Sequence, residues 1–172
     1  DDLGNYRTSA QYNCTTLATP DTTNPQAAIQ QPQDIWYNTN PPLNYTATDD
    51  IAIDSCWYSV DNWLNNFTLT GCANGTITDG VQGTRTIKLA ANDTSGNINN
   101  TASQQFSFDN VNPLVTINTP LNQTYAINWV ILNTTITDAT SGLNTTECYY
   151  TLNYFVTNSS FDCSYINLTS FA

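Results

Sequence analysis

Residues 55–62 read SCWYSVDN, and residues 147–154 read ECYYTLNY. In the first segment, Cys56, Tyr58 and Val60 fall on alternate positions and share one face of an extended chain. Alternation with a period of two is typical of a half-buried β-strand. The segment therefore predicts a strand with a cysteine on its inner face, and the second segment predicts that this strand occurs twice.

The two segments belong to a repeat with a period near 90 residues. Residues 24–32 (NPQAAIQQP) match residues 112–120 (NPLVTINTP), and Thr48-Asp49 matches Thr137-Asp138. Each copy also has a second cysteine downstream of the quoted segment. One domain type is therefore expected twice. The expected segments are an orphan N-terminal strand or linker (1–21), a first repeat (22–110) and a second repeat (111–172) that lacks its last strands.

Turn residues divide the first repeat into short extended segments. Turns are expected at 40–42, at Asp79-Gly80 and at 95–97, and the outward face of the quoted strand carries Trp57 and Ser59. Many short strands in about 90 residues, without a helical stripe, are typical of a β-sandwich. The strands expected are 27–31, 43–48, 55–61, 67–70, 76–78, 84–91 and 104–109.

The composition agrees with an all-β chain, because 29 Thr, 10 Tyr, 6 Phe and 4 Trp favour strands and 40% hydrophobic residues can fill a core. The 24 Asn, with Thr, give a surface of neutral amides and hydroxyls. The net charge of −11, with Arg7, Arg85 and Lys88 as the basic residues, argues against nucleic acid and anionic membrane as partners. The chain has no histidine, so its commonest general base is missing and we do not expect an enzyme. No membrane span is expected, since the longest apolar run is 129–132.

Four of the five cysteines form two local pairs, Cys56 with Cys72 and Cys148 with Cys163, separated by 16 and 15 residues. CxxC spacing and histidine partners are both absent, so zinc is not expected. We predict two disulfides, each worth about 3 kcal/mol in the chain-entropy view; buried free thiols are the alternative. Cys14 either bonds to something outside the chain or is a buried thiol.

Sequons of the form Asn-x-Ser/Thr are about twice as frequent as the roughly 6 that composition alone would give. The alternative is that an Asn- and Thr-rich chain forms them by accident. Together with the disulfides they predict an extracellular, cell-surface protein with N-linked glycans. The sequons are Asn13, Asn44, Asn66, Asn74, Asn92, Asn99, Asn122, Asn133, Asn144, Asn158 and Asn167.

The order of five motifs resembles the immunoglobulin-like or fibronectin-III-like tandem repeats of archaeal and bacterial surface proteins. The motifs are NPxxxIxxP, TATD, SCWYSVDN, GTRTIKLAANDTSGN and FSFDN, and the resemblance covers most of residues 22–172. It implies tandem immunoglobulin-like β-sandwiches that build stalks, adhesins, surface layers or extracellular filaments. The sequons and scarce lysine favour an archaeal member. The cysteines depart from the antibody pattern, because they flank one hairpin-sized loop.

The second repeat is expected to be an incomplete sandwich. In the first repeat Cys72 is followed by the predicted strand pair 84–91 and 104–109, whereas only nine residues follow Cys163. At the other end, 2–5 resembles 93–97, so 7–15 would take the place of a last strand. Two explanations stay open: a longer tandem array, or donation of residues 1–16 to a neighbouring copy. Either gives a head-to-tail polymer of copies of the module.

The predicted function is a structural subunit or segment of a glycosylated extracellular filament, stalk or surface layer. The alternative is an adhesin or carbohydrate-binding module. Aromatic residues stack on sugars, although they more often fill cores or subunit interfaces. The aromatic residues that would form such a platform are Trp36, Tyr37, Trp57 and Trp63.

Acidic residues offer few candidates for chemistry. Structural calcium would use Asp49, Asp50 and Asp54, together with 109–112 between the repeats, because hard cations prefer such oxygens. These residue types are also ordinary turn formers, and Asp93 and Asn97 are expected to form a turn. A glycosidase pair would need Asp49 with Asp54 or Asp61, and the single glutamate, Glu147, adjoins a cysteine. No catalytic or metal-binding residue is assigned.

Overall fold

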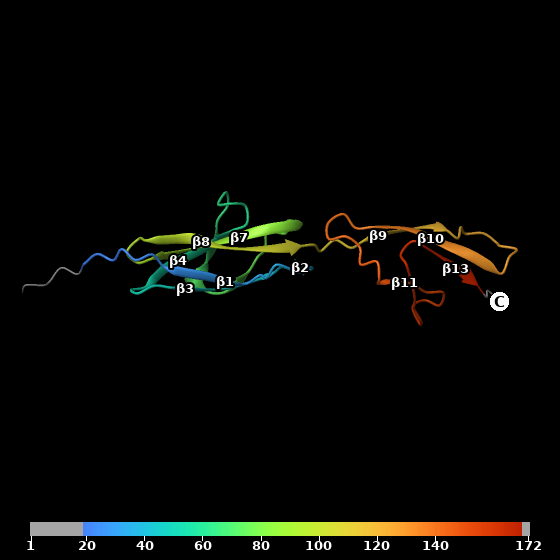
Figure 1. Ribbon diagram of the computed structural model, residues 1–172, viewed down its shortest axis with the longest axis horizontal. Helices are drawn as coiled ribbons and strands as arrows, with labels where there is room; N and C mark the ends of the chain where they lie inside the picture. Colours follow the sequence, from blue (N-terminus) through green and yellow to red (C-terminus); the bar gives the residue numbers. More distant parts are fainter. Residues whose placement is uncertain (1–18, 170–172) are drawn as a thin grey trace, which may run out of the picture.

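The computed structural model describes residues 19–169, which form an all-β protein of two modules lying end to end (Figure 1). We call residues 22–110 the first module and residues 111–169 the second module. The first contains β1 (Gln26–Gln31), β2 (Trp36–Tyr37), β3 (Pro42–Thr48), β4 (Ile53–Ser59), β5 (Phe67–Leu69), a 3-10 turn (Thr70–Cys72), β6 (Gly75–Thr76), β7 (Gly83–Asp93) and β8 (Ile98–Phe108). The second contains β9 (Leu114–Thr119), β10 (Trp129–Thr137), β11 (Cys148–Tyr150), β12 (Ser159–Phe161) and β13 (Tyr165–Thr169).

The first module has two sheets that share one hydrophobic core. One sheet has the order β1-β3-β6, and the other has the order β2-β8-β7-β4-β5. Neighbouring strands are antiparallel, except that β2 runs parallel to β8. Both sheets contribute to the core, which contains Leu43, Tyr45, Cys56, Tyr58, Val60, Leu69, Ile77, Ile87, Leu89, Ala91, Phe106 and Phe108.

The strand that the quoted segment predicts is β4, and its inner face is as expected. Cys56, Tyr58 and Val60 are all buried. The prediction for the outer face is wrong for Ser59, which is fully buried. Its hydroxyl donates to Asp61 over 2.8 Å and accepts the backbone N–H of Trp63 over 2.8 Å. These bonds satisfy a buried polar group that alternation alone would place in solvent.

The second module repeats the strand pairing of the first. Its sheets are β13-β10-β9 and the ribbon β11-β12. In the first module Gln26 pairs with Thr48, and in the second Leu114 pairs with Thr137. The irregularity between β1 and β3 also recurs between β9 and β10, and β11-β12 keeps the register of β4-β5. Each strand of the second module therefore has a counterpart: β9 for β1, β10 for β3, β11 for β4, β12 for β5 and β13 for β6.

Three strands of the first module, namely β2, β7 and β8, have no counterpart in the part of the second module that the structure describes. The burial of the two modules differs accordingly. The described second module buries Leu132, Cys163 and Leu168, whereas the first buries the twelve-residue core. A module that lacks one covering layer leaves its inner face open to solvent.

Two features of the first module differ from the sequence prediction. Strand β8 begins at Ile98, not at residue 104, because its polar first half pairs with β7 across the hairpin turn. Strand β2 was not expected, since it is only two residues long and pairs with the far end of β8. Both strands are defined by the neighbouring strands with which they pair, and not by an alternation of apolar and polar residues.

A matched pair of substitutions tests the difference in burial. Leu43→Ala should lower the free energy of unfolding by about 2–5 kcal/mol, because Leu43 is fully buried in the core. Leu152→Ala should change it by less than about 0.5 kcal/mol, because Leu152 is 64% exposed. Urea denaturation followed by tryptophan fluorescence and circular dichroism measures both. Equal losses for the two variants would contradict this description of the modules.

Candidate functional site

Both predicted disulfides are present. Cys56 of β4 is bonded to Cys72 of the 3-10 turn, and Cys148 of β11 is bonded to Cys163, just before β13. Each bond ties a strand ribbon to the segment that leads into the opposite sheet. Two disulfides indicate an oxidising environment. Cys14 and the sequon at Asn13 lie outside the described residues.

The predicted acidic group is only partly brought together. Asp21, Asp49 and Asp50 each place a carboxylate oxygen within 4.8 Å of the others, and such oxygens suit a hard cation. Asp54 is not in this group, and its carboxylate faces Asn92. Asp21 was not predicted, although it lies 88 positions before Asp109 in the repeat. Asp21 and Asp49 each accept one backbone N–H of their own turn, and the second oxygen of each carboxylate is buried without a hydrogen-bond partner. A cluster of turn carboxylates does not by itself establish a cation, so we assign no metal site.

The acidic segment between the modules has a structural role. The carboxylate of Asp109 accepts the backbone N–H of Val111 over 2.9 Å and that of Ser141 over 3.0 Å. The bonds from Ser141 and Val111 hold the pKa of Asp109 below its ordinary value, although burial acts in the opposite direction. Each oxygen of Asp109 thus accepts one backbone N–H, and the bond from Ser141 links the end of the first module to the second module.

Asp61, which was considered for a glycosidase pair, holds a loop through its carboxylate. Asp61 accepts hydrogen bonds from the backbone and side chain of Asn65 and from Ser59, and these lower its pKa to about 2. Glu147 adjoins the disulfide residue Cys148, and its backbone N–H donates to Asn144. The contacts of Asp61 thus explain the position of its carboxylate within the loop that follows β4.

Asp93 and Asn97 form the turn between β7 and β8, as expected. Asp93 is buried, and its carboxylate accepts the backbone N–H groups of Ser95 and Asn97 and the side-chain amide of Asn97. Burial favours the neutral form of Asp93. The hydrogen bonds from Asn97, Ser95 and Gly96 outweigh it, so the pKa of Asp93 lies below its ordinary value.

The four aromatic residues do not share one strand or one neighbouring pair of strands. Trp36 and Tyr37 lie on β2 at one edge of the five-stranded sheet, whereas Trp57 lies on β4 beyond β8 and β7. Strands are about 4.8 Å apart, so roughly 14 Å separates β2 from β4. Trp63 lies in the loop that follows β4. The fold therefore does not bring all four residues together in a single sugar-stacking platform.

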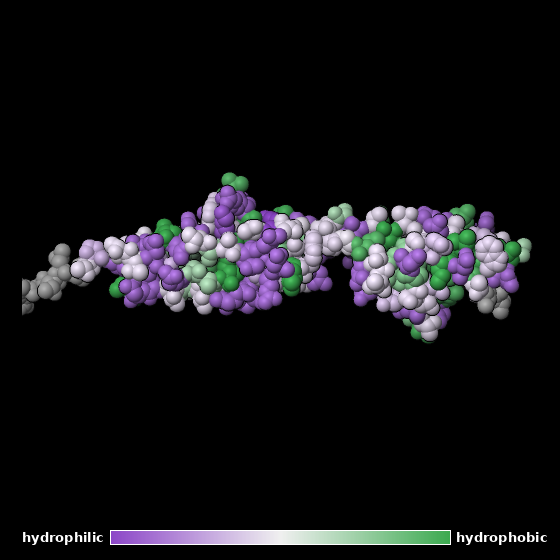
Figure 2. Space-filling model, viewed as in Figure 1, coloured by the Kyte–Doolittle hydropathy of each residue, from purple (hydrophilic) through white to green (hydrophobic). Residues whose placement is uncertain are grey.

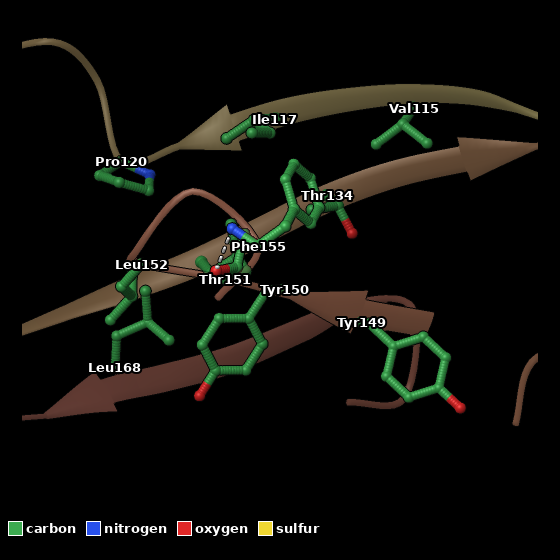
Figure 3. Close-up of a pocket in the computed structure, with 11 residues that line it drawn as sticks. Val115, Ile117, Pro120, Thr134, Tyr149, Tyr150, Thr151, Leu152, Phe155 and Leu168 are labelled. Carbon is green, nitrogen blue, oxygen red and sulfur yellow. Dashed lines mark hydrogen bonds between the residues drawn. The ribbon is translucent and has the colours of Figure 1, made fainter. Parts of the chain in front are cut away.

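The second module contains an apolar groove of about 420 Å³ between the β9-β10 sheet and the β11 ribbon (Figure 3). A neighbouring hollow of about 400 Å³ shares Val115 and Tyr149 with it. The groove is lined by Val115, Ile117, Pro120, Leu132, Thr134, Tyr149, Tyr150, Thr151, Leu152, Phe155 and Leu168.

Several of the lining side chains are exposed in spite of their apolar character. Val115 is 58% exposed, Ile117 61% and Phe155 79%. Green, hydrophobic residues interrupt the visible face of the second module in Figure 2. A contiguous exposed apolar patch of this kind marks an interaction surface. The repeat pattern predicts an incomplete second repeat but does not identify these residues, because their exposure depends on what is packed against them.

No protein-family model, curated protein or solved structure matches the chain. Among residues 19–169, no helix has the length and hydropathy that a membrane span requires.

Acid should destabilise the first module through Asp93. Because the pKa of this group is lower in the folded than in the unfolded chain, its contribution is complete above about pH 4 and is lost as the pH falls through the folded pKa. Asp93→Asn should be less stable than the wild type at pH 7 and should lose less on acidification. Urea unfolding between pH 7 and pH 2.5 measures this. An Asn variant with the wild-type acid slope would contradict it.

Proposed function

We propose that the chain is a structural segment of a glycosylated extracellular filament, stalk or surface layer, built from immunoglobulin-like β-sandwich modules placed head to tail. The module junction is the observation that carries this proposal. Strand β8 ends at Phe108, and β9 begins at Leu114. Asp109 lies between them: its backbone N–H donates to the carbonyl of Tyr37 in the first module, and its carboxylate accepts the N–H groups of Val111 and Ser141 in the second. These bonds limit bending between the modules.

Further bonds hold the junction. The side-chain amide of Gln82 donates to Asn110 over 2.7 Å, and the backbone N–H of Asn110 donates to Gln82 over 3.1 Å. The linker is thus tied to the β6-β7 loop of the first module. A short linker with several hydrogen bonds suits an elongated load-bearing segment more than a flexible tether.

The same turn precedes both modules. Asp21 accepts the backbone N–H of Thr23 over 2.8 Å, as Asp109 accepts that of Val111. The backbone carbonyl of Asp21 also accepts the side-chain amide of Asn97, in the β7-β8 turn. A turn that recurs at the entrance of each module supports a regular array with a period near 90 residues.

The surface supports an extracellular setting. Seven of the sequon asparagines are exposed, and neutral hydroxyl and amide groups replace most charges. Asn44 in β3 and Asn133 in β10 occupy equivalent places in the two modules, as do Asn66 and Asn158. The exposed sequons are Asn66, Asn74, Asn122, Asn133, Asn144, Asn158 and Asn167.

Small-angle X-ray scattering should test the structural role. The wild-type chain should scatter as an elongated particle whose maximum dimension is about twice that of one module. Asp109→Ala should broaden the distribution of dimensions, because it removes the acceptor shared by Val111 and Ser141. Asp34→Ala is the matched control at an exposed acidic residue. Saturable glycan binding by monomers, with wild-type dimensions for the Asp109 variant, would favour the adhesin instead.

Sequon occupancy should follow exposure and existing hydrogen bonds. In the folded protein Asn99 should stay unmodified, because its side-chain amide donates to the carbonyl of Pro25 over 2.8 Å. The exposed pair Asn66 and Asn158 should carry glycans. Peptide mass spectrometry of protein from an N-glycosylating host measures both. A fully occupied Asn99 beside an unmodified pair would contradict the expectation.

A further inference from the structure

We infer that the apolar groove of the second module holds a two-stranded β-hairpin of the β7-β8 type, which follows β13 in the same polypeptide beyond residue 172. The inference builds on the proposed function, because it specifies how one module of the array is completed. The first module shows what covers the face that is equivalent to the groove of the second module.

The two modules agree in register at each place where the groove is formed. Leu43 pairs with Gly75 in the first module, and Leu132 pairs with Ile166 in the second. On the ribbon, Tyr58 pairs with Phe67, and Tyr150 pairs with Ser159. The floor and wall of the groove are thus the same surfaces that enclose the core of the first module. There β7 and β8 pack against them, with Ile87, Leu89, Phe106 and Phe108 buried in the core.

The same positions have opposite exposure in the two modules. Val60 is 6% exposed, whereas Leu152 in the equivalent place is 64% exposed. Ile29 packs against the core of the first module, but its counterpart Ile117 is exposed. The hydrophobic effect favours covering such exposed apolar side chains.

Two backbone edges also match the missing strands. In the first module β4 lies between β5 and β7, whereas within residues 19–169 β11 pairs only with β12. Tyr37 lies on β2, which pairs with the end of β8, and its hydroxyl accepts the N–H of Gln33. Tyr125 repeats this turn by accepting the N–H of Leu121. Its segment has no strand partner among the described residues. The edge of β11 that is free among the described residues therefore fits a β7-type strand, and the segment around Tyr125 fits the end of a β8-type strand.

These features select a hairpin over a single strand. In the first module β8 pairs with β7 along most of its length and contacts β4 only through β7. A lone β8-type strand, such as residues 1–16 of another copy would supply, leaves either the β11 edge or the Tyr125 segment uncovered. The β7-β8 hairpin of another copy is already part of that copy's own core. Removing it would expose the core it came from.

The connection supports a source in the same polypeptide. Ile77 follows β6 and is buried, and Leu168 occupies the equivalent position in β13 and is also buried. The chain therefore continues from β6 in the first module and from β13 in the second module at equivalent positions of their three-stranded sheets. Only residues 77–82 separate β6 from β7 in the first module. A loop of that length is ordinary for linking neighbouring elements.

The test extends the 172-residue chain with a copy of residues 82–110 placed directly after Ala172, which keeps the spacing of the first module. The matched control carries serine in that copy at the positions of Ile87, Leu89, Phe106 and Phe108, so that length and turn residues are unchanged. Hydrogen–deuterium exchange is read on peptides from β9 to β13, with peptides from β1 to β6 as the internal reference.

The extended chain should slow exchange in the second module by about tenfold or more relative to the serine control, with no change in the first module. In the extended chain, Leu152→Ala should reverse about tenfold of this protection, because covering makes Leu152 a core residue. Equal exchange in the extended chain and the serine control would overturn the inference. So would polymers of the 172-residue chain that disappear when residues 1–18 are deleted, because they would assign the groove to strand donation.

These outcomes are separate from those of the proposed function. An elongated particle with a stiff Asp109 junction, together with a hairpin that protects nothing, would leave the structural role in place and remove only this inference. If the hairpin protects the second module in a chain that binds a glycan saturably, this inference would stand and the proposed structural role would fall.

Discussion

The need to cover the apolar inner face of a three-stranded sheet governs this structure. In the first module that face carries Leu43 and Tyr45, and the five-stranded sheet encloses it with Ile87, Leu89 and Phe106. The same three-stranded arrangement recurs as β9, β10 and β13. Among the described residues only the ribbon β11-β12 lies opposite, and Val115 and Ile117 remain exposed while Leu132 and Leu168 are buried. Because hydrophobic burial is the main favourable term in folding, this difference separates a finished core from an interaction surface.

The ends of the modules show a second, polar form of repetition. A carboxylate that accepts the N–H two residues further on precedes each module, at Asp21 and at Asp109. At the second position the same carboxylate reaches Ser141 across the junction. Such bonds cost little in chain entropy because the linker is short. The carboxylates of Asp109 and Asp93 thus fix the path of the chain between the modules and within the first module.

Local patterns predicted much of the fold. The alternation around Cys56 located β4 and its inner face, and the cysteine spacing located both disulfides. Other features depend on partners far away in the chain. Strand β2 is defined by the end of β8, and Ser59 is buried because loop N–H groups reach it. Asp21 approaches Asp49 and Asp50 only after the chain has folded. The sequence repeat predicts that the second module lacks a layer of strands. The residues that line the groove, however, can be identified only from the strand register of both modules.

The most direct measurement is hydroxyl-radical footprinting of the 172-residue chain, because it reports the solvent exposure of individual side chains. Leu152 and Phe155 should be modified several-fold faster, after correction for intrinsic reactivity, than their counterparts Val60 and Trp63. Equal corrected rates at the paired positions would contradict this expectation, because they would show that the second module already covers its inner face with the residues it has.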